Sequence, residues 1–275
     1  MISVLILTRN EEANLPACLD SVRWSDDVLV LDSFSTDRTL EVARERGARV
    51  AQNRFVDFAQ QRNHGIDLPG WKHDWILHLD ADERVTPALR DEMMSVIQSE
   101  AKDAYRVASK MMFEGRWLKH SGLYPSYQVR FGRRAALRFV QVGHGQRESL
   151  APERLGTLRE ALEHYSFSKG LDDWFKRHNR YSTAEAQQAL AEQGSAVDWP
   201  GVFAADTMRR RRALKQLFAR LPFRPALRFG YMYFLRRGFL DGGPGFRYCR
   251  LLSTYETMTV LKLREMRRRQ RGEQS

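Results

Sequence analysis

Short apolar segments alternate with helical patterns along the first part of the chain. Mainly apolar runs, typical of strands buried on both faces of a parallel sheet, lie at 3–7, 28–31, 49–51 and 75–79. Helix signals between these runs predict one helix that starts near Pro16 and others at 38–46, 58–67 and 86–100. This order predicts an α/β fold with a mainly parallel central sheet.

The pattern changes after residue 104. Strands are expected at 105–109, 128–131 and 137–142, separated by turns rich in glycine and aromatic residues. Helices are expected to dominate from 171 to 193, and a basic segment begins near Trp199. We therefore expect a sheet-based part followed by a helical part.

Charge is unevenly distributed over the 275 residues. The formal net charge is +11, yet residues 1–198 carry 27 basic and 29 acidic side chains, whereas residues 199–275 carry 18 basic and 5 acidic ones. With 43% hydrophobic and 29% charged residues, the composition is that of a folded globular chain. A uniformly basic DNA-coating protein is therefore excluded, and we expect a near-neutral body with a basic tail that attracts an anionic partner.

The basic tail is also apolar and aromatic. Apolar residues at 214–221 recur at helical spacing among lysine and arginine residues, and an entirely apolar segment follows at 229–235. A turn is expected at 240–246 and a further amphipathic helix at 248–265. Basic amphipathic helices rich in aromatic residues favour the interface of an anionic membrane. A helical cap with a solvated basic face and an RNA-binding segment are the alternatives.

The cysteine count and the N-terminus bear on location. Cys18 and Cys249 are too few for a disulfide framework and fit a reducing compartment. The apolar run at the N-terminus is short and lacks a basic leader, so it predicts a strand and not a signal peptide. The tail has no apolar run close to the roughly 20 residues that cross a bilayer. We therefore expect a cytoplasmic protein.

Polar residues follow several of the predicted strands at the point where each strand ends. They lie at 8–11, 32–37 and 80–83, and ligands bind at the carboxyl ends of strands in open α/β sheets. Asp80 and Asp82 could share one cavity, and carboxylate oxygens suit Mg²⁺ or Mn²⁺. The chain has neither a Gly-x-Gly-x-x-Gly motif after the first strand nor a P-loop, which disfavours dinucleotide redox chemistry and P-loop hydrolysis.

Four sequence motifs occur in an order that resembles a known family. They read VLILTRNE at 4–11, LDSFSTD at 31–37, QRNHG at 61–65 and LDAD at 79–82. With them the chain resembles the inverting family 2 glycosyltransferases, which implies a GT-A-type nucleotide-diphospho-sugar transferase fold. WLKHSGLYP at 117–125 and HYS at 164–166 look like the branch that includes lipopolysaccharide core β-glucosyltransferases.

The resemblance implies roles for the residues at the strand ends. Asp82 would ligate the Mg²⁺ or Mn²⁺ that bridges the donor diphosphate, with Asp80 and His164 as further candidate ligands. The residues implied to bind the nucleotide-sugar are Thr8, Asn10, Glu11, Asp32, Arg62 and Asp80. The chain departs from the family at Ser33 and Phe34, where a second acid and a glycine are frequent.

An inverting transferase also needs a general base, because the acceptor hydroxyl loses its proton as it attacks the anomeric carbon. In this family the base is an acid beyond the metal motif. The corresponding region here contains Glu148, which we take as the candidate base, and His144, which is the competing candidate.

Together these features predict a metal-dependent inverting glycosyltransferase. It would move a sugar from a nucleotide-sugar, by resemblance a UDP-sugar, to a membrane-embedded glycolipid such as the lipopolysaccharide core. A polyprenyl-phosphate sugar synthase and an inactive fold that serves as a membrane- or RNA-binding adaptor are the alternatives; for the transferase no nucleic-acid partner is expected.

The domain boundaries follow from the same features. Residues 1–168 would form the catalytic domain, with a nucleotide-sugar half at 1–100 and an acceptor half at 101–168. Residues 169–275 would form a helical region that associates from about residue 199 with the cytoplasmic face of the inner membrane.

Overall fold

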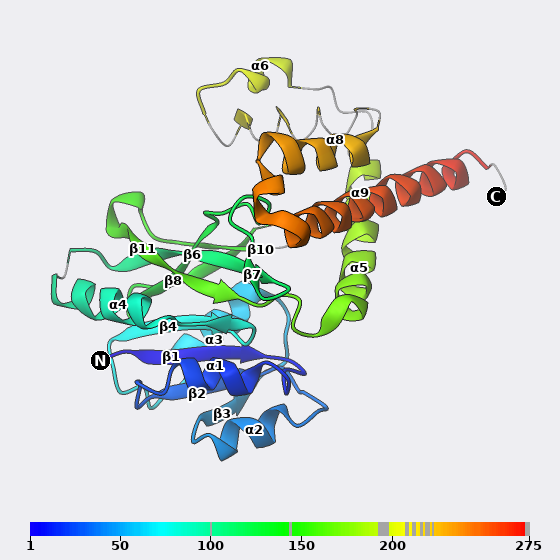
Figure 1. Cartoon of the computed structure of the whole chain (residues 1–275). Coiled ribbons are helices and arrows are strands. Elements are labelled where there is room, and N and C mark those ends of the chain that lie inside the picture. The colour runs from blue at the N-terminus through cyan, green and yellow to red at the C-terminus, as the bar shows by residue number, and fades with distance from the viewer. Residues whose placement is uncertain are drawn as a thin grey trace. The chain divides into compact units, whose positions relative to one another are not determined.

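The chain forms two compact units in a computed structural model (Figure 1). One unit comprises Met1–Trp117 and Leu123–Ser168, and the other comprises Leu118–Gly122 and Lys169–Ser275. The residues that the structure describes are 1–99, 101–142, 145–191, 198–206, 209–210, 213–214, 217, 221 and 223–272.

A mixed sheet forms the centre of the first unit. Four parallel strands lie at one side in the order β3 (Arg49–Gln52), β2 (Val28–Asp32), β1 (Ser3–Thr8) and β4 (Trp75–Asp80). The sheet continues through β8 (Tyr127–Arg133), β6 (Ala104–Phe113), β11 (Leu155–His164) and β5 (Glu83–Arg84), and β7 (Arg116–Trp117) pairs with β6. The predicted α/β class with a mainly parallel sheet is confirmed.

Helices cover both faces of the parallel strands. They are α1 (Leu15–Ser21), α2 (Thr39–Glu45), α3 (Phe58–Asp67) and α4 (Pro87–Ser99), and a short 3₁₀ turn, η1 (Pro152–Arg154), precedes β11. Alternate residues of β1 point to opposite faces, so Val4 and Ile6 pack with Leu15 and Leu89, whereas Leu5 packs with Ile66 of α3. Because both faces are covered, the strands read as continuous apolar runs.

A hairpin of β9 (Phe139–Val142) and β10 (Gly145–Glu148) lies outside the central sheet. It contacts α3, and Phe139 belongs to the hydrophobic cluster on the α3 face of the sheet. The sequence pattern predicts this strand at 137–142, so the predicted start is two residues too early and the predicted end is correct.

The second unit is helical in its described part. Its elements are α5 (Gly170–Ala191), α6 (Trp199–Val202), α8 (Arg224–Gly230), a π-helical turn η2 (Tyr231–Leu235), a 3₁₀ turn η3 (Gly238–Asp241) and α9 (Gly242–Gln270). Trp174 and His178 of α5 stack on each other, and the His178 ring meets Tyr255 of α9 edge-on. None of the helices in the described part of the chain is both long enough and apolar enough to span a bilayer.

The turn predicted at 240–246 is wrong over most of its length, because α9 begins at Gly242. A proline is tolerated in the first turn of a helix, where its missing N–H has no intrahelical partner, so Pro244 does not stop the helix. Gly245 is required for packing, since a Cβ there would overlap the Gly238 carbonyl. Of the apolar stripe predicted at 214–221, Leu214, Leu217 and Leu221 are among the described residues, and Phe218 lies outside them.

Candidate functional site

The parallel register brings the predicted polar strand ends to one edge of the sheet. Thr8 pairs with Asp32 across β1 and β2, and Leu7 pairs with Asp80 across β1 and β4. Because these strands end at the same level, the loops that follow them share the carboxyl edge, where open α/β sheets bind ligands.

Asp32 joins the first two strand ends from inside. It is fully buried and accepts hydrogen bonds from Thr8 Oγ1 at 3.0 Å, the Ser35 amide at 2.8 Å and Gln52 Nε2 at 3.2 Å. Its carboxylate therefore supports both loops in the ligand-free chain. The nucleotide contacts predicted for Thr8 and Asp32 stay predictions.

Asn10 and Glu11 connect the same loops through their main-chain amides and the Asn10 side chain. Asn10 has a left-handed φ of 55°, its amide donates to Ser35 Oγ at 2.7 Å, and its Oδ1 accepts from the Thr36 amide at 2.8 Å. The Glu11 amide donates to Thr39 Oγ1 at 2.8 Å. These contacts fix the loop after β1 against the start of α2.

Two buried arginines hold Asp80. Arg62 Nη2 of α3 donates to Asp80 Oδ1 at 2.8 Å, and Arg130 Nη2 of β8 donates to Oδ2 at 2.6 Å. Arg130 also donates to Glu83 Oε1 at 2.9 Å, and Glu83 Oε2 accepts from the Asp80 amide at 2.9 Å. The four side chains form one network, which we call the arginine clamp: Arg62, Asp80, Glu83 and Arg130.

The arginine clamp shifts the acidity of its members. Burial raises the pKa of Asp80, but Arg130 and Arg62 outweigh it and hold that pKa well below its usual range. Burial, followed by repulsion from Arg130, lowers the pKa of Arg62 to about 10. Nε and Nη1 of both guanidinium groups are buried and have no hydrogen-bond partner among the described residues. Both guanidinium groups are thus held by the carboxylates of Asp80 and Glu83.

The sequence patterns did not single out Arg130. Its only signal was a charged residue within the strand predicted at 128–131, at a position that the structure buries. A buried arginine needs a charged partner, so this position could have been matched with a strand-end acid.

Asp82 and His164 meet although they lie 82 residues apart in the chain. Asp82 Oδ2 lies 3.2 Å from His164 Nε2, and the Tyr165 amide donates to the Asp82 carbonyl at 2.8 Å. The antiparallel pairing of His164 with Glu83 in β11 and β5 creates this contact. Burial lowers the pKa of His164, but the hydrogen bond and charge of Asp82 prevail and raise it to about 8.

The Asp82–His164 pair has the donor chemistry that a divalent cation accepts. One carboxylate oxygen and one imidazole nitrogen suit Mn²⁺, and an octahedral cation completes its shell with water and substrate phosphate oxygens. Both oxygens of Asp80 face guanidinium groups. Within the described residues, no group of three or more His, Cys, Asp or Glu side chains is arranged to hold a metal ion. The pair thus fits two ligand positions of such a cation.

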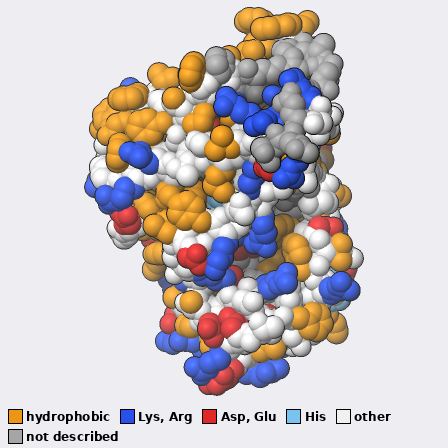
Figure 2. All heavy atoms as spheres, turned by 90° about the vertical axis from the view of Figure 1, so that its right-hand side faces the viewer, with side chains coloured by type: hydrophobic (Ala, Val, Ile, Leu, Met, Phe, Trp, Pro, Cys, Tyr) orange, Lys and Arg blue, Asp and Glu red, His pale blue; other side chains and the backbone are white. Residues whose placement is uncertain are grey.

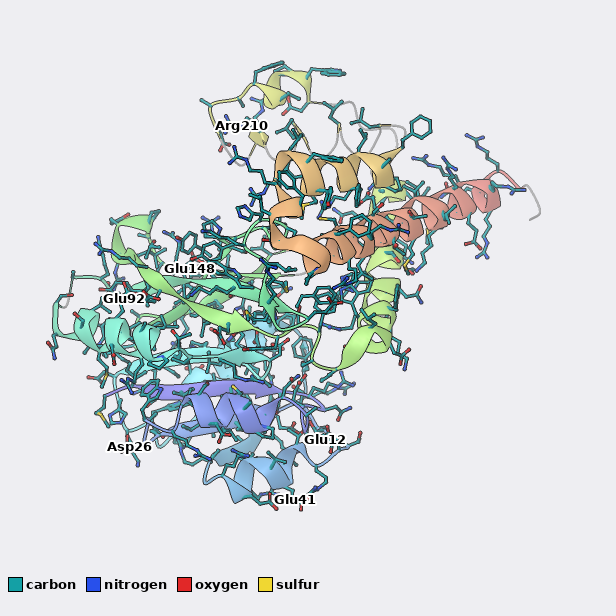
Figure 3. The ribbon with its side chains drawn as sticks, in the orientation of Figure 1. Glu12, Asp26, Glu41, Glu92, Glu148 and Arg210 are labelled. Atoms are coloured by element: carbon teal, nitrogen blue, oxygen red, sulfur yellow. The ribbon has the colours of Figure 1, made fainter. Side chains whose placement is uncertain are left out.

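Glu148 lies on β10, opposite Phe139 of β9 (Figure 3). Its Oε1 is 3.7 Å from Arg106 Nη2, which is within ion-pair distance. The competing candidate, His144, lies outside the described residues.

The motif at 61–65 on α3 connects these parts. Gln61 donates to Ser33 Oγ at 3.2 Å, and Arg62 holds Asp80. The Asn63 side chain donates to the Phe139 carbonyl at 2.8 Å and accepts from the Phe139 amide at 3.0 Å, which fixes the hairpin that carries Glu148. At Gly65 a Cβ would lie 2.5 Å from Leu5 Cδ2, so the helix packs directly on β1.

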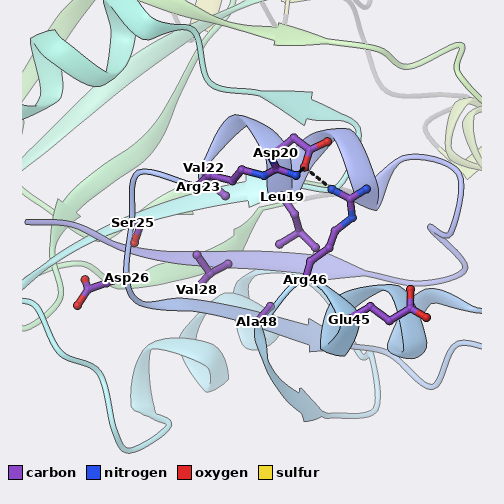
Figure 4. Close-up of a pocket in the computed structure, with 11 residues that line it drawn as sticks. Leu19, Asp20, Val22, Arg23, Ser25, Asp26, Val28, Glu45, Arg46 and Ala48 are labelled. Atoms are coloured by element: carbon purple, nitrogen blue, oxygen red, sulfur yellow. Dashed lines mark hydrogen bonds and ion pairs between the residues drawn. The ribbon is translucent and has the colours of Figure 1, made fainter.

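A surface hollow of about 580 Å³ lies at the other end of the strands (Figure 4). Val28 and Ala48, at the starts of β2 and β3, line it, and Asp20 forms ion pairs there with Arg23 and Arg46. None of the predicted site residues lines this hollow. We therefore place the candidate site at the carboxyl edge, where the polar residues converge.

Comparison with known proteins gives consistent matches. A model of the family "Glycosyl transferase family 2" matches residues 3–146, which is more than half of the chain. An "Uncharacterized glycosyltransferase" of Rickettsia bellii is 26% identical over 277 aligned positions that cover 96% of this chain and 86% of that protein. The "Lipopolysaccharide core biosynthesis glycosyltransferase LpsC" of Rhizobium meliloti is 24% identical over 269 positions, 95% of this chain and 91% of that protein.

Solved structures match less closely. Glucosyl-3-phosphoglycerate synthase from Mycobacterium tuberculosis, solved with Mn²⁺, uridine diphosphate and glucosyl-3-phosphoglycerate, has a TM-score of 0.44 and 18% identity. The match covers 63% of this chain and 74% of that one.

Proposed function

Since the chain belongs to glycosyl transferase family 2 and is a glycosyltransferase, we propose that it moves a sugar from a nucleotide-sugar to a membrane-embedded glycolipid. The observation that carries this proposal is the carboxyl edge of the sheet. There the partly exposed Asp82–His164 pair lies next to an Asp80 held by two buried arginines.

The donor would lie over the loops after β1, β2 and β4. In this proposal Thr8 and Asp32 face the nucleoside, Arg62 contacts the base, and Asp80 faces the ribose. Asn10 and Glu11 shape the first loop. The hydrogen bonds that join Asp32 to Thr8 and to the Ser35 amide support such a prearranged surface. We take UDP as the nucleotide from the family resemblance.

Asp82 and His164 would hold Mg²⁺ or Mn²⁺, and Asp80 stays a predicted third ligand. When bound, the cation would supply positive charge to the leaving diphosphate. Asp82 would contribute its carboxylate and His164 its neutral imidazole, a form that competes with the proton favoured by the raised pKa of His164. The arginine clamp keeps Asp80 ionised next to the Asp82–His164 pair.

Glu148 would act as the general base, with His144 as the alternative. The acceptor oxygen forms a bond to the anomeric carbon while the bond from that carbon to the diphosphate oxygen breaks. The hydroxyl proton passes to the Glu148 carboxylate, and the electron pair of the broken bond stays on the nucleoside diphosphate. Attack from the face opposite the leaving group inverts the configuration.

The acceptor would be a glycolipid of the lipopolysaccharide core type, at the cytoplasmic face of the inner membrane. Two observations support this part of the proposal. The relative LpsC is named as a core biosynthesis glycosyltransferase, and residues 199–275 combine 18 basic with 5 acidic side chains.

A nucleotide-sugar screen tests the proposal. The chain is incubated with UDP-, GDP- and dTDP-sugars and Mn²⁺, and both release of the nucleoside diphosphate and thermal stabilisation are measured. We expect one donor to be bound and slowly hydrolysed, Asp82→Ala to lose metal-dependent binding, and Asp20→Ala, at the other end of the strands, to keep it. Full metal-dependent activity of Asp82→Ala would contradict the assignment of Asp82.

A further inference from the structure

A turn in the second unit exposes apolar side chains to solvent. It runs from Tyr231 to Leu240 and comprises η2, Arg236, Arg237 and most of η3; we call it the tip. Leu235 is 77% exposed and Phe234 is 62% exposed, and Tyr231, Phe239 and Leu240 are exposed as well. Clustered exposed apolar side chains mark an interaction surface.

The tip is held from within and cannot bury these side chains by a small shift. Asp241, at the end of η3, is buried and accepts from the His120 amide at 3.0 Å, the Ser121 amide at 2.7 Å and Ser121 Oγ at 2.7 Å. Met232 is fully buried, and a Cβ on Gly238 would lie 2.7 Å from the Met232 carbonyl oxygen. The inner side of the tip is therefore tightly packed while its outer side is apolar.

Positive charge accompanies the apolar surface. Arg237, exposed and in the left-handed region with a φ of 60°, lies within the tip, and Arg236 precedes it. Figure 2 shows hydrophobic patches next to lysine and arginine side chains on one face of the molecule. The excess of basic over acidic residues at 199–275 selects an anionic occupant.

The types of side chain in the tip distinguish between RNA and an anionic lipid surface as its partner. Aromatic side chains of the tip, such as Phe234, could stack with the bases of single-stranded RNA. The most exposed apolar side chain of the tip, however, is Leu235 at 77%, and Leu235 and Leu240 offer no stacking platform. Leucine and phenylalanine side chains instead gain free energy in the boundary between headgroups and acyl chains, while arginine meets the lipid phosphates.

We propose that the tip inserts into the surface of an anionic lipid bilayer. Phe234, Leu235 and Leu240 enter the acyl boundary, and Arg237 contacts lipid phosphates. This inference rests on the proposed function for the membrane-embedded acceptor. It adds to that proposal the protein surface that contacts the lipid.

An environment-sensitive dye on the tip tests the insertion. Leu235→Cys and, as a control, Leu261→Cys of α9 are labelled in the full chain; Leu261 is 57% exposed. The control lies about 28 Å along α9 from the helix start that adjoins the tip. Both native cysteines, Cys18 and Cys249, are buried, so labelling is selective.

With vesicles of phosphatidylcholine and phosphatidylglycerol we expect a blue shift of the dye at position 235 and little change at 261. Equal responses at both positions, or none at 235, would overturn the proposal. A blue shift at 235 that grows with protein concentration in the absence of lipid would show a second copy as the occupant. A shift produced by RNA oligonucleotides alone would show RNA.

A charge substitution supplies the second measurement. Leu235→Glu should weaken partition into the same vesicles at least about tenfold, because one buried leucine is lost and a carboxylate meets the anionic surface, whereas Leu261→Glu should change it little. Both variants should keep nucleotide-sugar binding, which reports on the donor site. A wild-type chain that binds vesicles but no nucleotide-sugar would refute the proposed function and leave the tip assignment standing.

Discussion

At the scale of single residues, Arg130 decides whether the Asp80 and Glu83 carboxylates are neutralised. Its guanidinium contacts both carboxylates. Asp80 is also paired with Arg62, and Glu83 also accepts a hydrogen bond from the Asp80 amide. Removing one partner from a buried network leaves an uncompensated charge, which costs more than the network itself contributes.

We therefore expect Arg130→Met to lower the free energy of unfolding by about 3–5 kcal/mol in urea denaturation. Arg90→Met, which breaks the solvent-exposed pair with Asp91, should cost at most about 1 kcal/mol. Adding Glu83→Gln to Arg130→Met should restore part of the loss because it removes one stranded carboxylate. Equal losses for Arg130→Met and Arg90→Met would refute the clamp as a stabilising network.

Asp27 gives a pH-dependent prediction away from the candidate site. Burial raises its pKa, but hydrogen bonds from Ser3 Oγ, the Lys72 amide at 2.8 Å and Arg49 Nη2 at 2.9 Å outweigh burial, so its pKa lies below its usual range. The unfolded chain therefore takes up this proton first as the pH falls.

The stability from Asp27 is fully present above the unfolded pKa, about 3.9, and is lost as the pH falls through the lower folded value. Urea denaturation between pH 7 and acid should show wild-type stability approaching that of Asp27→Asn at low pH. Asp91→Asn, an exposed control, should follow the wild-type curve. A constant gap between wild type and Asp27→Asn at every pH would contradict this reasoning.

Local sequence patterns predicted the acids of the site but not their partners. Asp80 and Asp82 directly follow a buried strand, so a single short segment of the sequence is enough to indicate them. Arg130 lies 50 residues from Asp80, and its role depends on β8 pairing with β4, which no local pattern encodes. His164 was reached only through the family resemblance, and the roles of all these residues stay predictions.

At the scale of elements, the packing of α3 on β1 sets the position of Arg62 and Asn63. Gly65 allows this approach, because a Cβ there would meet Leu5 Cδ2 at 2.5 Å and Leu31 Cδ2 at 3.3 Å. Both leucines are fully or almost fully buried, so they have little room to give.

Gly65→Ala should therefore lower the free energy of unfolding by about 1–3 kcal/mol despite the better helix propensity of alanine. It should also weaken nucleotide-sugar binding, since Arg62 moves with the helix. Gly230→Ala is the control: its φ is −57°, its Cβ would meet nothing within 4 Å, and we expect no loss or a gain of up to about 1 kcal/mol. Thermal unfolding of both variants measures these changes. A Gly65→Ala variant as stable as the wild type would show that α3 can shift freely on β1.

Strands and helices with strong local periodicity were predicted well, and short or shared elements were not. The strands at 3–7, 28–31 and 75–79 agree with β1, β2 and β4 within one residue. β5 and the long β11 were not expected, because β5 has only two residues and gains its strand geometry from pairing with β11. The glycines after Asp241 suggested a turn, but tertiary packing makes them the start of α9.

At the scale of the whole molecule, charge is segregated by sequence position. The excess of basic over acidic residues lies at 199–275, whereas residues 1–198, which carry the proposed donor site, are close to neutral. Attraction to an anionic surface is long-ranged but screened over about 10 Å at 0.1 M salt.

Vesicle binding by the full chain should therefore weaken as salt is raised, with a residual part from the apolar tip. Replacing Arg237, Arg247 and Arg250, which are exposed in the tip or in the first part of α9, by glutamine should weaken binding at low salt by up to about 1 kcal/mol per residue. The same change at Arg23, Arg38 and Arg90 of the first unit should have little effect. Sedimentation with phosphatidylglycerol vesicles measures this, and an equal loss in both triple variants would argue against a localised binding surface.

The pairing of β5 with β11 has a consequence for how the protein is made. β11 lies between β6 and β5 in the sheet, and only its last residue, His164, reaches Asp82. A nascent chain on the ribosome already contains Asp82, the arginine clamp and the strands β1 to β4 before this residue leaves the exit tunnel. Synthesis must therefore pass beyond β11 before Asp82 and His164 can meet, so the contact that we propose as a metal site forms late in translation.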